Sequence, residues 1–197
     1  MPPEPLASPA ALRAHARAEL QKYADHFAAE ASGLQAIADL LADTSADPFS
    51  RGHMQGHITT SGLVYDAAAD KVLLIHHRTL DRWLQPGGHH EGLDRLDASA
   101  AREVEEETGV HVRGPHAQGR DALLIDIDSH AIPANPAKGE GAHVHHDFLY
   151  LFTGDATAPL SPQWEEVRGV CWVARASLLS LPSARFERLV SKLQRVP

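Results

Sequence analysis

The sequence predicts an α/β domain with a mixed central sheet, preceded by a helical extension. Two observations carry this prediction besides the length of 197 residues, which suits one ordinary domain with an extension. The first is an alanine-rich, amphipathic segment over residues 9–43. The second is a series of apolar runs of strand length, at residues 57–65, 72–77, 123–128, 148–152 and 167–173. We therefore divide the chain into a helical extension, residues 1–50, and an α/β domain, residues 51–197.

The extension is expected to form two helices. Leu12, Leu20, Tyr23 and Phe27 are spaced as one apolar stripe, and a similar stripe follows Gly33. Such helices serve more often for packing or for dimerisation than as a site. The sequence therefore leaves a homodimer open, and a lid over the substrate is the less favoured interpretation.

The strands and turns follow in order along the domain. Residues 47–56 are rich in turn formers, and a turn at 66–70 separates the first two predicted strands. Residues 132–141 contain prolines and glycines and are expected to form a loop that could contact the substrate. A final helix is predicted over residues 183–195, with Ser183 as its cap.

Residues 87–110 carry the chemistry. A helix is predicted from about Asp97, which would act as N-cap, to Gly109, a residue suited to a left-handed helix end. Glu103, Glu106 and Glu107 fall on one arc of this helix, where like charges repel by roughly 0.2–0.5 kcal/mol per pair. A divalent cation such as Mg²⁺ turns that repulsion into binding, because it prefers oxygen ligands.

The two glycines before this helix, Gly87 and Gly88, support the same interpretation. A turn without side chains lets a backbone carbonyl approach the ion from the strand side. The segment is therefore interpreted as a metal cradle.

The same segment resembles the Nudix box, which is Gly, five residues, Glu, seven residues, then Arg-Glu-apolar-any-Glu-Glu-any-Gly-apolar. One position departs, because Asp94 stands where the family has its first Glu, and Leu93 precedes it in place of the common Gly. A pairing between this shorter acid and Arg102 is expected to be altered. The remaining positions match at the correct spacing: Gly88, Arg102, Glu103, Val104, Glu106, Glu107, Gly109 and Val110.

The resemblance implies an α/β/α sandwich and a pyrophosphohydrolase. The implied reaction is metal-dependent hydrolysis of a diphosphate linkage in a nucleoside diphosphate joined to another moiety, with Mg²⁺ or Mn²⁺ as cofactor. The implied catalytic residues are Arg102, Glu103, Glu106 and Glu107. The implied metal ligands are Gly88, through its carbonyl, with Glu103, Glu106 and Glu107. Which glutamate is the general base, and which residues choose the substrate, stay open.

Three alternatives are kept beside this one. The first is a catalytically inactive Nudix-like domain that only binds a ligand. Such a domain would be expected to lose acidic residues of the box, and this chain keeps all three glutamates. Isopentenyl-diphosphate isomerase resembles the fold but depends on a catalytic cysteine, and Cys171 lies in a late apolar run. A zinc hydrolase built on His143, His145 and His146 is the third.

Further polar residues near the box are weighed more lightly. His89 and His90 follow the glycines. A role beside a bound ion and a position in an exposed loop are given equal weight for both residues. Glu165 and Glu166 precede the last predicted strand and are interpreted by default as exposed acids. The resemblance to Nudix enzymes, some of which use an acid from outside the box as an extra ligand or base, leaves that role open for them.

Composition restricts the partners. A net charge of −8 and a pI near 5.9 argue against nucleic acid or an anionic membrane surface. The N-terminal ten residues lack the basic and apolar regions of a signal peptide, and no run reaches the ~20 apolar residues of a membrane span. A cytoplasmic protein that acts on a small nucleotide or diphosphate is expected.

Overall fold

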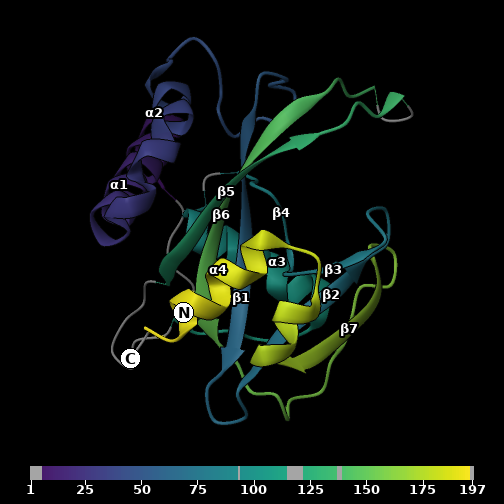
Figure 1. Cartoon of the computed structure of the whole chain (residues 1–197). Helices are drawn as coiled ribbons and strands as arrows, with labels where there is room; N and C mark the ends of the chain where they lie inside the picture. Colours follow the sequence, from purple (N-terminus) through teal and green to yellow (C-terminus); the bar gives the residue numbers. More distant parts are fainter. Residues whose placement is uncertain (1–5, 93, 115–121, 137–138, 196–197) are drawn as a thin grey trace.

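A mixed sheet with helices on both faces forms the body of the molecule in the computed structural model (Figure 1). The structure describes residues 6–92, 94–114, 122–136 and 139–195. Leu93 therefore lies outside the described residues. Among the helices described, none is both long and apolar enough to cross a bilayer.

The sheet has seven strands, and its main path runs in the order β3-β2-β1-β6-β5. β4 pairs with β1, and β7 pairs with β2. β1 and β6 run parallel while the other pairs are antiparallel, which makes the sheet mixed, as predicted. The bounds are β1 His57–Asp66, β2 Lys71–His77, β3 Arg82–Leu84, β4 Gly87–His89, β5 Leu123–Ile132, β6 His143–Thr153 and β7 Val167–Ala174.

Two strands are longer than their apolar runs predicted. β5 and β6 continue past residues 123–128 and 148–152 because polar residues also pair there. Asp128 is opposite Asp147, and His130 is opposite His145. Backbone pairing does not require apolar side chains, so the apolar runs located these strands but underestimated their length.

The helices occupy both faces of the sheet, with α4 in front of it and α3 behind it in the view of Figure 1. Two short 3₁₀ segments, η1 and η3, accompany the four α-helices. Their bounds are α1 Pro9–His26, η1 Ala28–Leu34, α2 Gln35–Ala42, α3 Leu96–Thr108, η3 Arg175–Ser180 and α4 Ala184–Leu193.

The start of α3 differs from the prediction. Arg95, not Asp97, is the N-cap residue, and Asp97 lies in the first turn, where its carboxylate is 3.0 Å from Arg95 Nε. A carboxylate in the first turn still interacts favourably with the helix dipole. The C-terminus is as predicted, because Gly109 adopts the left-handed conformation with φ of 74°.

The core has a part on each face of the sheet. The N-terminal helices share one part with α3 and the sheet, where Tyr23, Ile37, Leu96 and Phe148 are buried together. The other part lies beneath α4 and is represented by Leu149 and Leu189. Each such side chain contributes about 1.5–3 kcal/mol when buried, so the N-terminal helices are integral to the fold.

A buried ionic network joins the extension to α4. Lys192 Nζ lies 2.7 Å from Asp126 Oδ1 on β5 and 2.8 Å from the Tyr23 hydroxyl on α1. Arg185 Nε donates to Asp126 Oδ2 at 2.9 Å, and Arg185 Nη1 donates to Asp147 Oδ2 at 2.7 Å. These bonds offset the cost of burying the charges.

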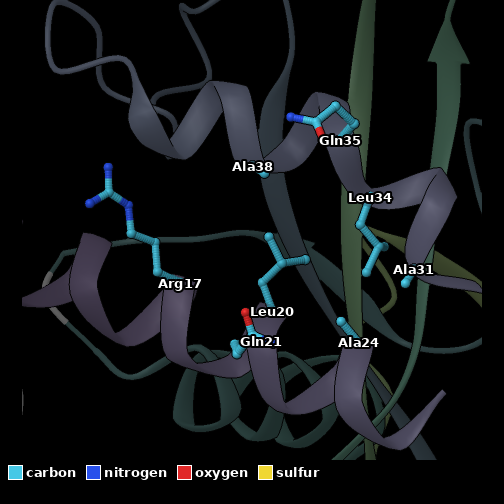
Figure 2. A pocket seen from close by; sticks show the side chains of 8 residues that line it. All are labelled: Arg17, Leu20, Gln21, Ala24, Ala31, Leu34, Gln35 and Ala38. Carbon is cyan, nitrogen blue, oxygen red and sulfur yellow. The ribbon is translucent and has the colours of Figure 1, made fainter. Parts of the chain in front are cut away.

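The space between α1 and the η1–α2 segment is a groove of about 330 Å³ (Figure 2). Leu20, Ala24, Leu34 and Ala38 line much of it, and Arg17 is its one charged lining residue. Arg17 Nη2 donates to the Leu41 carbonyl at 2.6 Å and so ties the two helices together. The groove belongs to helix packing and brings no reactive groups together.

Candidate active site

The glycines of β4 lie directly against the acidic side chains of α3. The Gly87 N–H donates to Glu107 Oε2 at 2.8 Å. A Cβ atom on Gly88 would lie 2.5 Å from Glu103 Oε2, and one on Gly87 would lie 2.5 Å from Ser61 Cβ. Real Cβ atoms do not approach so closely, so position 87, which also faces the backbone of β1, requires glycine, whereas a side chain at position 88 would displace the Glu103 carboxylate. The structure thus brings the predicted glycine turn and two of the predicted glutamates together.

The three box glutamates differ in environment. Glu103 and Glu107 are 9% and 2% exposed, whereas the Glu106 side chain is 48% exposed. Burial raises the pKa of Glu103 to about 7 and that of Glu107 to about 8. The hydrogen bond from Gly87 acts in the opposite direction on the pKa of Glu107 but does not offset the desolvation. Two desolvated carboxylates side by side are the arrangement that a divalent cation stabilises.

Arg102 spans two of these acids. Its Nη2 lies 3.0 Å from Glu103 Oε1, and its Nη1 lies 2.9 Å from Glu106 Oε2. Glu91 Oε2 is more distant, at 4.0 Å. The ion pairs of Arg102 within the described part of the chain are with Glu91, Glu103 and Glu106. Arg102 therefore fixes the orientation of Glu103 at the edge of the cradle.

A fourth acid stands near the cradle from a distant part of the sequence. The negative charge of Glu166 contributes to the raised pKa values of both Glu103 and Glu107. Glu166 lies just before β7, and its backbone carbonyl accepts from the Arg78 N–H at 3.0 Å. Sequence reasoning treated it as an ordinary exposed acid, because nothing local to residues 165–166 indicates proximity to α3.

A histidine cluster lies on the other side of β4. Gly88 faces Glu103, and the next residue, His89, faces the opposite way because side chains alternate along a strand. We define the histidine cluster as His57, His89, His130, His143 and His145, whose neighbouring ring centroids are 4.7–5.7 Å apart.

Three of these residues converge more closely than the rest. His57, His143 and His145 each offer one ligand atom, and these atoms lie within 4.8 Å of one another. His57 comes from β1 and the other two from β6, where the parallel register places His57 opposite His145. No pattern around His57 in the sequence indicates this position, since only the pairing of distant strands brings it to β6.

His146 does not join this group. Its Nδ1 is 2.8 Å from Ser129 Oγ, and it points away from His143 and His145, as strand alternation predicts. The set of three histidines suggested for zinc, His143, His145 and His146, therefore does not converge. His90 is also separate, since it is buried with its ring centroid 5.3 Å from that of Phe49.

Burial lowers the pKa of three of these histidines, His57, His89 and His145. Desolvation lowers the pKa of His145 to about 3 and that of His89 to about 4, and neighbouring imidazoles add to both effects. The charge of Arg51 also lowers the pKa of His89 and, to a smaller extent, that of His57. Neutral imidazoles carry a free lone pair, which is the form that binds a metal ion.

A hollow in the surface lies beside Arg51, whose charge acts on His89 and His57. An open hollow of about 650 Å³ is lined by Arg51, Gly52, Met54, Gly139 and Glu140. Arg51 Nη2 lies 2.6 Å from Glu140 Oε1, so the predicted loop over residues 132–141 packs against the entry to β1. Lys138 of that loop lies outside the described residues.

Comparison with known proteins agrees with this geometry. The family model described as NUDIX domain matches residues 56–193, more than half of the chain. The chain therefore belongs to the Nudix hydrolase family. The family, and the class of enzyme that its name denotes, are those that the box predicted.

Individual relatives are similar over shorter stretches. The chain is 34% identical over 94 residues to a protein of Lactococcus lactis named "Probable DHNTP pyrophosphohydrolase", a match that covers 48% of this chain and 52% of the relative. It is 37% identical over 62 residues to "Nucleoside diphosphate-linked moiety X motif 6" of Xenopus laevis, which covers 30% and 29% respectively. The chain thus spans about half the length of the first relative and less of the second.

A solved structure shares the fold. The Nudix-family hydrolase of Clostridium perfringens superposes with a TM-score of 0.51 at 22% identity, over 72% of this chain and 98% of that one. At this identity the likeness concerns the fold, and it confirms the expected α/β/α arrangement.

Proposed function

We propose that this protein hydrolyses a diphosphate linkage in a nucleoside diphosphate joined to another moiety, with Mg²⁺ or Mn²⁺ as cofactor. The observation that carries the proposal is the convergence of the two buried carboxylates, Glu103 and Glu107, on the glycine turn of β4. A helix that was merely acidic would direct such groups into solvent, because burying unpaired carboxylates is costly.

The residues present fit a hard divalent cation. Glu103 and Glu107 supply buried oxygen ligands, Glu106 supplies a third beside them, and the absence of a side chain on Gly88 leaves room for its carbonyl to take part. An ion bound there would neutralise phosphate oxygens and lower the pKa of a water molecule. Nitrogen and sulfur ligands, which softer metals prefer, are absent from this set of four residues.

The protein's own groups have distinct proposed roles. Arg102 holds Glu103 and Glu106 in position through ion pairs of 3.0 and 2.9 Å. One buried glutamate accepts the proton of the attacking water. The Gly87 N–H orients the Glu107 carboxylate.

Names of relatives support the substrate class. One is named a pyrophosphohydrolase and the other a nucleoside diphosphate-linked motif protein, and each shares at least a third of its matched residues with this chain. The choice of nucleotide and of the second moiety stays open, since the box contacts only the diphosphate.

The test is a panel of dinucleotides, nucleotide sugars, ADP-ribose and oxidised nucleotides, assayed with Mg²⁺ for release of phosphate or mononucleotide. We expect one class to be hydrolysed, with activity lost in chelator and in Glu103→Gln. Glu105→Gln is the matched control, because Glu105 is exposed on the same helix and faces His111 at 3.1 Å. Hydrolysis that survives both chelator and Glu103→Gln would contradict the proposal.

Further proposals follow from the sequence. We propose that the helical extension ends and the Nudix domain begins at about residue 50, and that the protein is cytoplasmic. We propose that the main role of the extension is the packing of α1 and α2 on the sheet. A homodimer is a further prediction, which a sedimentation experiment would test. The silent-domain alternative predicts nucleotide binding without turnover in the same panel.

A further inference from the structure

The histidine cluster is the feature that the proposed hydrolysis does not use. It lies across β4 from the carboxylate cradle, and five imidazoles from four strands meet there. His57 and His143 are buried and the other three rings are partly buried, so polar nitrogens that have left water need partners within the protein.

Hydrogen bonds to the backbone fix the orientation of two of these rings. His143 Nδ1 lies 2.8 Å from the Gly141 carbonyl, and His57 Nδ1 lies 3.3 Å from the His53 carbonyl. A carbonyl only accepts, so in each ring Nδ1 carries the proton and Nε2 carries a free lone pair. Ligands of metal ions in proteins typically show this second hydrogen bond from the opposite ring nitrogen.

The candidate ligand nitrogens of the three residues lie close together. His143 Nε2 and His145 Nε2 are 3.1 Å apart, close to the ~3.3 Å that separates two nitrogens on one tetrahedral Zn²⁺ with bonds of about 2.0–2.1 Å. His57 Nε2 is buried, its residue is 0% exposed, and it has no hydrogen-bond partner among the described residues. The ligand atoms of all three residues lie within 4.8 Å of one another.

A simple hydrogen bond explains part of this arrangement. His145 could donate to His143 Nε2, which would satisfy those two rings. It would leave His57 Nε2 buried without a partner, and such a group costs about 1–3 kcal/mol. A shared metal ion satisfies all three nitrogens.

We propose that His57, His143 and His145 form a site for a divalent transition-metal ion of the Zn²⁺ class, separate from the carboxylate cradle of the box. Three imidazole nitrogens select Zn²⁺, Co²⁺, Ni²⁺ or Cu²⁺ over Mg²⁺ and Mn²⁺, which prefer oxygen. A tetrahedral ion with three protein ligands keeps one position for water or another oxygen donor. His89, with its ring centroid 5.1 Å from those of both His57 and His145, is the nearest further imidazole.

The experiment measures Zn²⁺ and Co²⁺ binding to full-length protein without an affinity tag, after metals are removed with a chelator. A competing chromophoric chelator gives the stoichiometry and affinity, and Co²⁺ gives an absorption spectrum that reports coordination. We expect one tightly bound Zn²⁺ per chain and a loss of affinity of roughly a hundredfold or more in His145→Gln.

Two controls locate the ion. His146→Gln changes the next residue on the same strand, on its opposite face, and is expected to leave Zn²⁺ affinity unchanged. Glu107→Gln removes a carboxylate of the box and is also expected to leave it unchanged. The inference therefore fails or holds independently of the proposed hydrolysis.

A measurement on the unaltered protein covers the case in which His145→Gln does not fold. In ¹⁵N-imidazole NMR spectra, Zn²⁺ should shift the ring signals of His57, His143 and His145. The proposal is overturned if no stoichiometric Zn²⁺ binds, if His145→Gln folds and binds as tightly as the parent, or if Zn²⁺ shifts none of these three rings.

Discussion

The backbone N–H of Gly87 donates to Glu107 Oε2 at 2.8 Å, and this bond joins β4 to the helix that carries the box acids. The carboxylate is 2% exposed, and burial raises its pKa to about 8. The ionised carboxylate therefore destabilises the folded protein, which indicates that Glu107 is required for something other than stability.

Replacement of Glu107 by Gln should separate stability from activity. Gln keeps an oxygen that can accept from Gly87 and removes a buried charge, so the melting temperature should stay level or rise. Loss of an anionic ligand should lower the hydrolysis rate by a factor on the order of 10²–10³. Both quantities are measured on the same preparation, and an undiminished rate would show that the acidic arc is not a metal cradle.

The metal-free protein should lose stability as pH rises above neutrality. The pKa values of Glu103 and Glu107, about 7 and about 8, lie above those of the unfolded chain. The folded state therefore binds more protons from about pH 4.5 upward, and the free energy of unfolding falls as pH rises through the folded-state pKa values. Added Mg²⁺ should oppose this loss.

The measurement compares melting temperatures at pH 7.0 and 8.5 in chelator, with and without excess Mg²⁺. This range avoids the titration of His89 and His145, whose lowered pKa values act in the opposite direction below about pH 6.5. Glu107→Gln should reduce the slope, and an equal slope in that variant would contradict the assignment.

Gly88→Ala should reduce activity with little loss of folding. The new Cβ would lie 2.5 Å from Glu103 Oε2, and the flexible end of that side chain would move away from the cradle. The hydrolysis rate should fall while the circular dichroism spectrum is retained. Gly33→Ala is the control, because its Cβ would meet no atom within 4 Å. Equal rates in the two variants would show that the approach of Gly88 to Glu103 is unimportant.

Asp126→Ala should be severely destabilising. This carboxylate is 0% exposed and accepts from Lys192, Arg185 and Arg188, so its removal takes the central anion out of a network whose Lys192 and Arg185 side chains are largely buried. Loss of one member of a buried ion pair costs about 3–5 kcal/mol. Urea denaturation gives the free energy of unfolding, and exposed Asp39→Ala should change it by less than about 0.5 kcal/mol. A similar effect of both changes would indicate that the network contributes nothing.

The sequence predicted the parts of the site that are local in the chain. Gly88, Glu103 and Glu107 belong to one strand-turn-helix unit, so their spacing alone determines that they meet. His57 and Glu166 reach their sites only through pairing of distant strands, and no pattern around either residue reports it. The lengths of β5 and β6 were underestimated for a related reason, since polar residues such as Asp128 and His145 interrupt the apolar runs although their backbones continue to pair.

Pairing of β1 with β6 also governs when the protein can fold. The Thr59 hydroxyl donates a hydrogen bond to Asp147, which lies 88 positions later in the sequence. Pairing of the parallel strands β1 and β6 therefore costs the entropy of closing a large loop before the contacts between them stabilise the protein. Contacts of such high sequence separation slow folding. A growing chain on the ribosome therefore contains the whole box by residue 110 but lacks the β6 strand beside β1. We expect the box to become resistant to proteolysis only once the available chain extends past about residue 153, so free chains truncated after residue 115 and after residue 175 should differ in the protection of the box.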